Sequence, residues 1–166
     1  AIRMDKKTAF VKLKNKIAVK WKNRKTVIMR RNRRFLKGIE LFAEERKEQE
    51  QTVFSKDIKI SVIVPLYNTP ERFLRDMIES VQAQTFANWE LCLGDGSDEA
   101  HPDVERIAWE YGAKDKRIVY RRLEKNEGIS GNTNACLAFA TGNYVAMMDH
   151  DDMLHPAALF RCAMEI

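Results

Sequence analysis

Three carboxylates stand within four residues in the segment Asp149-His150-Asp151-Asp152. The segment follows an apolar run, residues 144–148, that is typical of a buried strand, and His155-Pro156 then begins a helix. Crowded carboxylates raise one another's pKa unless a cation neutralises them. Mg²⁺ and Mn²⁺ take oxygen ligands and keep part of their coordination shell for substrate phosphates. The cluster therefore predicts a metal-assisted nucleotide or phosphate site, and the alternative is an acidic turn that caps the next helix.

Three further loops carry groups that could contact a nucleotide. Pro65-Leu66-Tyr67-Asn68 offers an aromatic ring that could lie against a base. Asp95-Gly96-Ser97 offers a carboxylate that can accept hydrogen bonds, beside a glycine that lets a ligand approach the backbone. Residues 126–134 place helix N-terminal amides where an anion could bind. Each loop also has a plain interpretation, as a helix entry, an Asp-Gly turn or ordinary N-capping.

Alternating strand and helix patterns position these loops. Strands are expected over 58–66, 89–93, 117–120 and 144–148, where short apolar runs occur. Helices are expected to begin at Pro70, Pro102 and Gly128, and a last one over 156–166. Such alternation predicts an α/β fold with a parallel, right-handed sheet. In such a sheet the loops after the strands gather at one edge, where ligands bind.

The charge is distributed unevenly along the chain of 166 residues. Residues 1–37 hold 15 Lys and Arg and one acid, Asp5, a charge of +14; the whole chain carries +5, so the remainder carries −9. This contrast predicts two parts, a basic helical arm with a charged linker over 1–56 and an α/β domain over 57–166.

The arm has an amphipathic pattern. Phe10, Leu13, Ile17 and Trp21 recur at helical spacing among lysines and arginines, and a second pattern runs through Phe35, Ile39 and Phe42. A basic amphipathic helix suits an anionic membrane surface. A packing arm against the domain or another subunit is an equal alternative. Nucleic acid is not expected as a partner, because no nucleic-acid motif accompanies the charge.

Several classes of protein are not favoured by the composition. The chain lacks the run of about 18 apolar residues that a membrane span needs, and no signal peptide is visible. Cys92, Cys136 and Cys162 lie in apolar patterns without zinc-site spacing, so reduced core thiols of a cytoplasmic protein are expected. Peripheral attachment to the inner membrane face through the arm would be compatible with this location.

The order of the motifs resembles the nucleotide-sugar glycosyltransferases of family 2, which have the GT-A fold, a Rossmann-like parallel sheet with flanking helices. The resemblance covers residues 58 to about 159 and leaves out the basic arm. It is carried by Ser61-Val-Ile-Val-Pro-Leu-Tyr-Asn68, Gln84-Thr-Phe-Ala-Asn-Trp-Glu-Leu91, Asp95-Gly-Ser97, Asp115-Lys-Arg-Ile118, Gly128-Ile-Ser130, Asn134, Ala140-Thr-Gly142 and Asp149-His-Asp-Asp152.

The resemblance implies transfer of a sugar from a UDP- or dTDP-sugar to a hydroxyl acceptor, a glycan or a lipid-linked sugar, in surface polysaccharide synthesis. It implies that Mn²⁺ or Mg²⁺ is held by Asp149, Asp151 and Asp152, of which Asp149 and Asp151 form the DxD pair. It also implies a nucleotide site made by Pro65, Tyr67, Asn68, Asp95, Gly128, Asn134 and Asp149.

The chain departs from the family pattern in three places. Gly94 precedes a lone Asp95 where the family usually has two acids, and Thr133 stands where many members have Arg. The chain ends 14 residues after Asp152, so the general base is expected beyond Ile166. The chain is therefore expected to be the donor- and metal-binding half, truncated at its C-terminus and inactive by itself.

Two other functions compete with this interpretation. A non-catalytic nucleotide-binding module would have the same loops without a catalytic half. An aspartyl-phosphate phosphotransferase would need a nucleophilic Asp after its first strand, where this chain has Pro-Leu-Tyr-Asn.

Overall fold

The computed structural model describes residues 43–166. The contacts within the chain separate residues 1–40 from a compact unit of residues 41–166, which contains the whole α/β portion. The two amphipathic patterns of the basic arm, through Trp21 and through Phe42, lie outside the described residues.

Strands and helices alternate from residue 60 onward, after an initial helix α3. The elements, in chain order, are α3 (Ala43–Gln51), β1 (Ile60–Leu66), α4 (Glu71–Gln82), β2 (Trp89–Asp95), α5 (Pro102–Lys114), β3 (Ile118–Arg122), α6 (Gly128–Phe139), β4 (Tyr144–Met147) and α7 (Ala158–Met164). Each predicted strand and helix of the α/β portion is present. Their ends differ by a few residues, because strand ends and helix caps leave little periodic signal.

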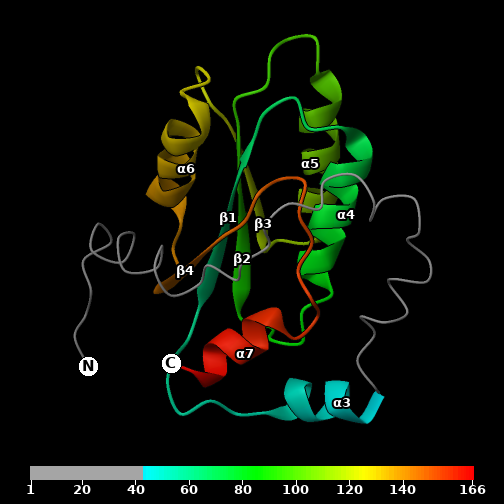
Figure 1. Cartoon of the computed structure of the whole chain (residues 1–166), viewed down its shortest axis with the longest axis vertical. Coiled ribbons are helices and arrows are strands. Elements are labelled where there is room, and N and C mark those ends of the chain that lie inside the picture. Colours follow the sequence, from blue (N-terminus) through cyan, green and yellow to red (C-terminus); the bar gives the residue numbers. More distant parts are fainter. Residues whose placement is uncertain (1–42) are drawn as a thin grey trace. The chain divides into compact units, whose positions relative to one another are not determined.

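All pairings in the four-stranded sheet are parallel, and the strand order is β3-β2-β1-β4. Helices α4 and α5 lie on one side of the sheet and α6 lies on the other (Figure 1). The predicted α/β fold of GT-A type, a Rossmann-like parallel sheet with flanking helices, is thus confirmed. Among the described helices none combines the length and apolar character that a membrane crossing requires.

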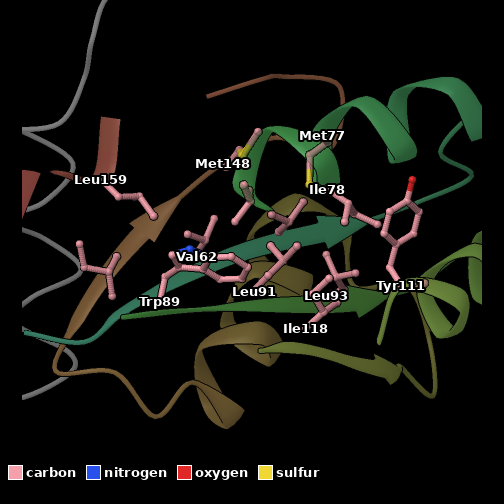
Figure 2. Packing of buried hydrophobic residues seen from close by; sticks show 14 of the residues in the cluster. Val62, Met77, Ile78, Trp89, Leu91, Leu93, Tyr111, Ile118, Met148 and Leu159 are labelled. Carbon is pink, nitrogen blue, oxygen red and sulfur yellow. The ribbon is translucent and has the colours of Figure 1, made fainter. Parts of the chain in front are cut away.

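Alternating side chains of β1 supply the cores on the two faces of the sheet. Val62 and Val64 face the cluster beneath α4 and α5, which also holds Trp89 and Leu91 (Figure 2). Ile63 faces the smaller cluster beneath α6. Both faces are covered, which explains why the strand reads as a continuous apolar run.

The cysteines fit the prediction of reduced core thiols. Cys92 and Cys136 are buried and Cys162 is half-buried, and none of the three forms a disulfide. Burial raises the pKa of the Cys92 thiol to about 12 and that of Cys136 to about 11, so both are neutral packing groups.

The amino edge of the sheet is fixed by one buried carboxylate. Glu90, on β2, accepts hydrogen bonds from the Thr141 hydroxyl at 2.7 Å and from the Gly142 amide at 3.0 Å. Lys59 lies 3.0 Å from the same carboxylate, and Ser61 also donates to it. The Ala140-Thr-Gly142 segment thereby joins α6 to β4 in a fixed position, with Gly142 in close contact with Ser61.

Candidate donor and metal site

The carboxyl edge of the sheet brings the predicted loops together. In the register of the sheet Leu66 pairs with Asp95, and Ile63 pairs with Met147, the last residue of β4. Asp149 follows Met147 by two residues, so Asp95 and the acidic segment leave the same edge with β1 between them. Asp95 and the acidic segment therefore lie at the same edge of the sheet, as a common site requires.

Asp95 is fully buried, and its carboxylate is held by three donors. Its Oδ1 accepts from the Ser97 amide at 2.8 Å. Its Oδ2 accepts from the Tyr120 hydroxyl at 2.8 Å and from the Arg122 guanidinium at 2.9 Å. A carboxylate has about four acceptor positions, and these bonds occupy three of them. Tyr120 and Arg122 come from β3, and no motif in the sequence pointed to them.

The loop after β1 is fastened to the loop after β2. The Asn68 amide N–H donates to the Ser97 hydroxyl at 2.8 Å. The Asn68 side chain donates to Asp98 at 2.8 Å and accepts from the Asp98 amide at 3.0 Å. Asn68 has a φ of 49°, a left-handed conformation that asparagine tolerates. Its side chain therefore shapes the loop.

Pro65 and Tyr67 flank this fastening. Pro65 lies on β1 opposite Gly94 of β2. Tyr67 is 45% exposed at the edge, where its ring can be reached by a ligand. An exposed tyrosine in a loop that is fastened to its neighbour can stack on a planar base.

The start of α6 is organised by Asn132, in the loop that the sequence offered either as an anion site or as ordinary N-capping. Asn132, only 2% exposed, donates to the Asn126 side chain at 2.9 Å and accepts from the Glu127 amide at 3.0 Å. Gly128 is exposed and has a φ of 71°, which only glycine adopts readily. Asn134 is exposed on α6. Burial, which the sequence does not reveal, distinguishes Asn132 from Asn134.

Cys136 accounts for the glycine at position 94. A Cβ atom on Gly94 would lie 2.5 Å from the Cys136 sulfur, closer than real Cβ contacts allow. An acid at this position would need a smaller residue at 136. The lone Asp95 is therefore a consequence of how α6 packs on β2.

The acidic turn, residues 149–152, follows β4 directly. The turn is closed by a hydrogen bond from the Asp152 amide to the Asp149 carbonyl at 3.2 Å. Asp149 and Asp152 are exposed and Asp151 is half-buried. His150 is half-buried, and within the described part of the chain its Nδ1 has no hydrogen-bond partner.

The donor set of the turn fits a hard divalent cation. Among residues 43–166 no group of three His, Cys, Asp or Glu side chains is arranged to hold an ion by itself. Mg²⁺ is commonly bound by one or two carboxylates, with water and substrate phosphates completing the shell. Exposed carboxylates in a short turn can supply that smaller number of ligands.

The chain matches the model of a protein family. Residues 61–166 match the model described as Glycosyl transferase family 2. The matched residues comprise the sheet, its flanking helices and the acidic turn.

Individual relatives match the same part of the chain. The protein y4gI of Sinorhizobium fredii is 46% identical over 100 residues, 60% of this chain and 11% of that protein. The UDP-Glc:alpha-D-GlcNAc-diphosphoundecaprenol beta-1,3-glucosyltransferase WfgD of Escherichia coli is 36% identical over 99 residues, 58% of this chain and 36% of that protein. The chain spans between 11% and 36% of the length of the first curated relatives it matches.

Among solved structures, TarS of S. aureus is similar in fold. It superposes with a TM-score of 0.58 at 29% identity, over 64% of this chain and 32% of the TarS chain. A crystal structure of TarS in complex with UDP-GlcNAc gives the same TM-score.

Proposed function

Because this chain belongs to glycosyl transferase family 2, we propose that it is the donor-binding part of an enzyme that transfers a sugar from a UDP- or dTDP-sugar. The acceptor is a hydroxyl of a glycan or of a lipid-linked sugar, in surface polysaccharide synthesis. The observation that carries the proposal is the shared edge, where the fixed carboxylate of Asp95 and the acidic turn flank β1. The similarity to TarS, which has been crystallised with UDP-GlcNAc, supports this class of donor.

In the proposed site, the base lies against Tyr67, beside Pro65, and near Asp95, which a local movement must uncover before a base N–H can donate to it. Asn68 holds the loop that presents Tyr67, through its bonds to Ser97 and Asp98. A carboxylate oxygen accepts hydrogen bonds, so an N–H of the base is the matching group.

The diphosphate lies between the acidic turn and the start of α6. Gly128 leaves room for a phosphate near the α6 amides, and the exposed Asn134 can donate to a phosphate oxygen. One or two of Asp149, Asp151 and Asp152 would hold the cation together with phosphate oxygens, and Asp149 could also accept from a ribose hydroxyl. Mn²⁺ or Mg²⁺ bound there would supply Lewis-acid neutralisation of the departing diphosphate.

The basic arm is proposed as a second point of attachment. Its charge of +14 over residues 1–37 would attract an anionic membrane surface, where lipid-linked acceptors are found. This would place the enzyme at the cytoplasmic face of the membrane.

Calorimetry of UDP and dTDP with the whole 166-residue chain tests the donor site. We expect binding that Mn²⁺ strengthens, and Asp151→Asn should weaken the metal-dependent part about tenfold. Asp57→Asn is the matched control, because Asp57 is an exposed acid preceding β1 at the amino edge. Absent binding, or binding unaffected by Mn²⁺, would contradict the proposal.

A further inference from the structure

The acidic turn is anchored where the chain enters it. Met148, the residue before Asp149, is only 7% exposed and belongs to the main core cluster (Figure 2). Its amide donates to the Ile63 carbonyl at 3.2 Å, which continues the ladder between β4 and β1. The start of the turn is therefore fixed by the sheet and by the core.

A second anchor holds the chain where it leaves the turn. The Ser80 hydroxyl accepts from the Leu154 amide at 3.1 Å. The Gln84 side chain donates to the His155 carbonyl at 2.8 Å and accepts from the Leu159 amide at 2.9 Å. Ser80 and Gln84 are buried, so these bonds are shielded from water. Both residues come from α4 and its C-terminal end.

Gln84 also caps α7. The first N–H groups of a helix have no partner within the helix. Ala157, at the N-cap position, supplies no side-chain acceptor. The Gln84 oxygen provides one to Leu159, from a residue 75 positions earlier in the chain.

We propose that Gln84 is a positioning residue for the cation site, an inference that rests on the proposed function. The segment 149–153 lies between the anchor at Met148 and an exit that Ser80 holds at Leu154, Gln84 at His155 and the Thr85 amide at Pro156. A short segment with both ends fixed has few conformations, so its carboxylates are held near one arrangement. Removing the Gln84 bonds at the exit leaves the same carboxylates but lets the segment adopt more conformations. This weakens binding of the cation more than binding of the base.

The test compares Gln84→Met with Ser61→Ala in the 166-residue chain. Methionine keeps the size of glutamine without its hydrogen bonds. Ser61 is also a buried hydrogen-bonding residue, but it lies at the amino edge, where it contacts Glu90. Calorimetry of UDP with and without Mn²⁺ gives the factor by which the metal strengthens binding. We expect Gln84→Met to reduce this factor about tenfold and to leave metal-free UDP binding within about twofold.

A second substitution at position 84 tests the same contacts. Gln84→Glu keeps an acceptor for Leu159 but replaces the amide N–H donor, which bonds to the His155 and Ser80 carbonyls, by a second carboxyl oxygen, so its factor should also be reduced. Hydrogen exchange at the Leu154 and Leu159 amides should be faster in Gln84→Met than in Ser61→Ala.

The outcomes separate the inference from the function beneath it. If Mn²⁺ does not change UDP binding to the wild-type chain, the proposed function and the inference are both overturned. The inference alone would be overturned by a different result. In that result Mn²⁺ strengthens UDP binding to the wild-type chain, but the substitutions at positions 84 and 61 change the strengthening factor equally or not at all.

Discussion

The guanidinium of Arg122 lies 2.9 Å from the carboxylate of Asp95, across the neighbouring carboxyl ends of β3 and β2. Asp95 is fully buried, whereas the Arg122 side chain is 37% exposed. The Arg122 guanidinium, which solvent can still reach, therefore neutralises the buried negative charge of Asp95. Tyr120 shares the same carboxylate oxygen, and burial together with that hydrogen bond raises the pKa of the tyrosine.

Replacing Arg122 by methionine should destabilise the protein by about 2 kcal/mol, because a buried carboxylate loses its counter-charge. The figure is below the usual range for buried pairs, since Arg122 is partly exposed. Chemical denaturation at neutral pH measures the loss. Arg121→Met is the control, because Arg121 lies over the Phe139 ring at 4.6 Å and should cost less than about 1 kcal/mol. Equal losses in the two variants would contradict the role given to the Arg122–Asp95 pair.

Gly94→Ala should destabilise the protein by about 1–3 kcal/mol, because the new methyl group would lie 2.5 Å from the Cys136 sulfur. Adding Cys136→Ala should recover at least about 1 kcal/mol of that loss beyond additivity. Thermal or chemical unfolding of the two single variants and the double variant measures the coupling. Gly112→Ala is the control, since its methyl would meet only the Ile118 carbonyl at 3.4 Å in a helix that favours alanine. Additive effects at positions 94 and 136 would contradict the contact.

The sheet could be predicted well because its strands carry a local signal. Residues 60–66 and 89–95 are mostly apolar, as expected where both faces of the sheet are covered, and the turn residues between elements are an equally local signal. The gathering of loops at one edge follows from parallel pairing alone. This is why the placement of Asp95 and the acidic turn at one edge could be expected from the residues.

Two of the groups that fix the site gave no local signal of their contacts. Gln84 and Arg122 act on partners that the fold brings near them. Gln84 contacts residue 159, and Arg122 contacts residue 95, on another strand. Neither hydrophobic periodicity nor turn chemistry reports a polar contact across such distances in the chain. Which of the predicted residues contact a donor remains a prediction.

Glu90 should make the protein sensitive to acid. Burial raises the pKa of this carboxyl, but hydrogen bonds from Ser61 and Thr141, with Lys59 nearby, outweigh it and lower the pKa to about 2. A lowered pKa in the folded state stabilises the fold above the unfolded value of 4.5, and that stabilisation is lost as the pH falls towards about 2. Glu90→Gln should cost about 2 kcal/mol at neutral pH and should flatten the decline of the free energy of unfolding between these values.

Glu110→Gln provides the comparison for Glu90. Hydrogen bonds from Arg75 and Lys114 lower the pKa of Glu110 to about 2 as well, but its contacts are exposed to solvent. Exposed pairs contribute little, so this variant should unfold nearly as wild type does at neutral pH. Unfolding measured from pH 7 to 2 distinguishes the two. A Glu90→Gln variant that follows the wild-type curve throughout would refute the assignment.

Helix α3 should depend on one hydrogen bond between buried side chains. The Thr85 hydroxyl donates to the Gln49 side chain at 2.7 Å, beside the residues that hold the exit of the acidic turn. Thr85→Val should leave the Gln49 oxygen buried without that donor, at a cost of about 1–2 kcal/mol, and should speed hydrogen exchange in residues 43–51. Thr52→Val is the control, because its hydroxyl bonds only to the exposed Glu48 carbonyl and should change exchange little. Because both partners of one bond are removed, Thr85→Val with Gln49→Ala should be less damaging than the sum of the single changes. If the two losses simply added, α3 would be held by other contacts, such as that from Arg46 to the Ala83 carbonyl.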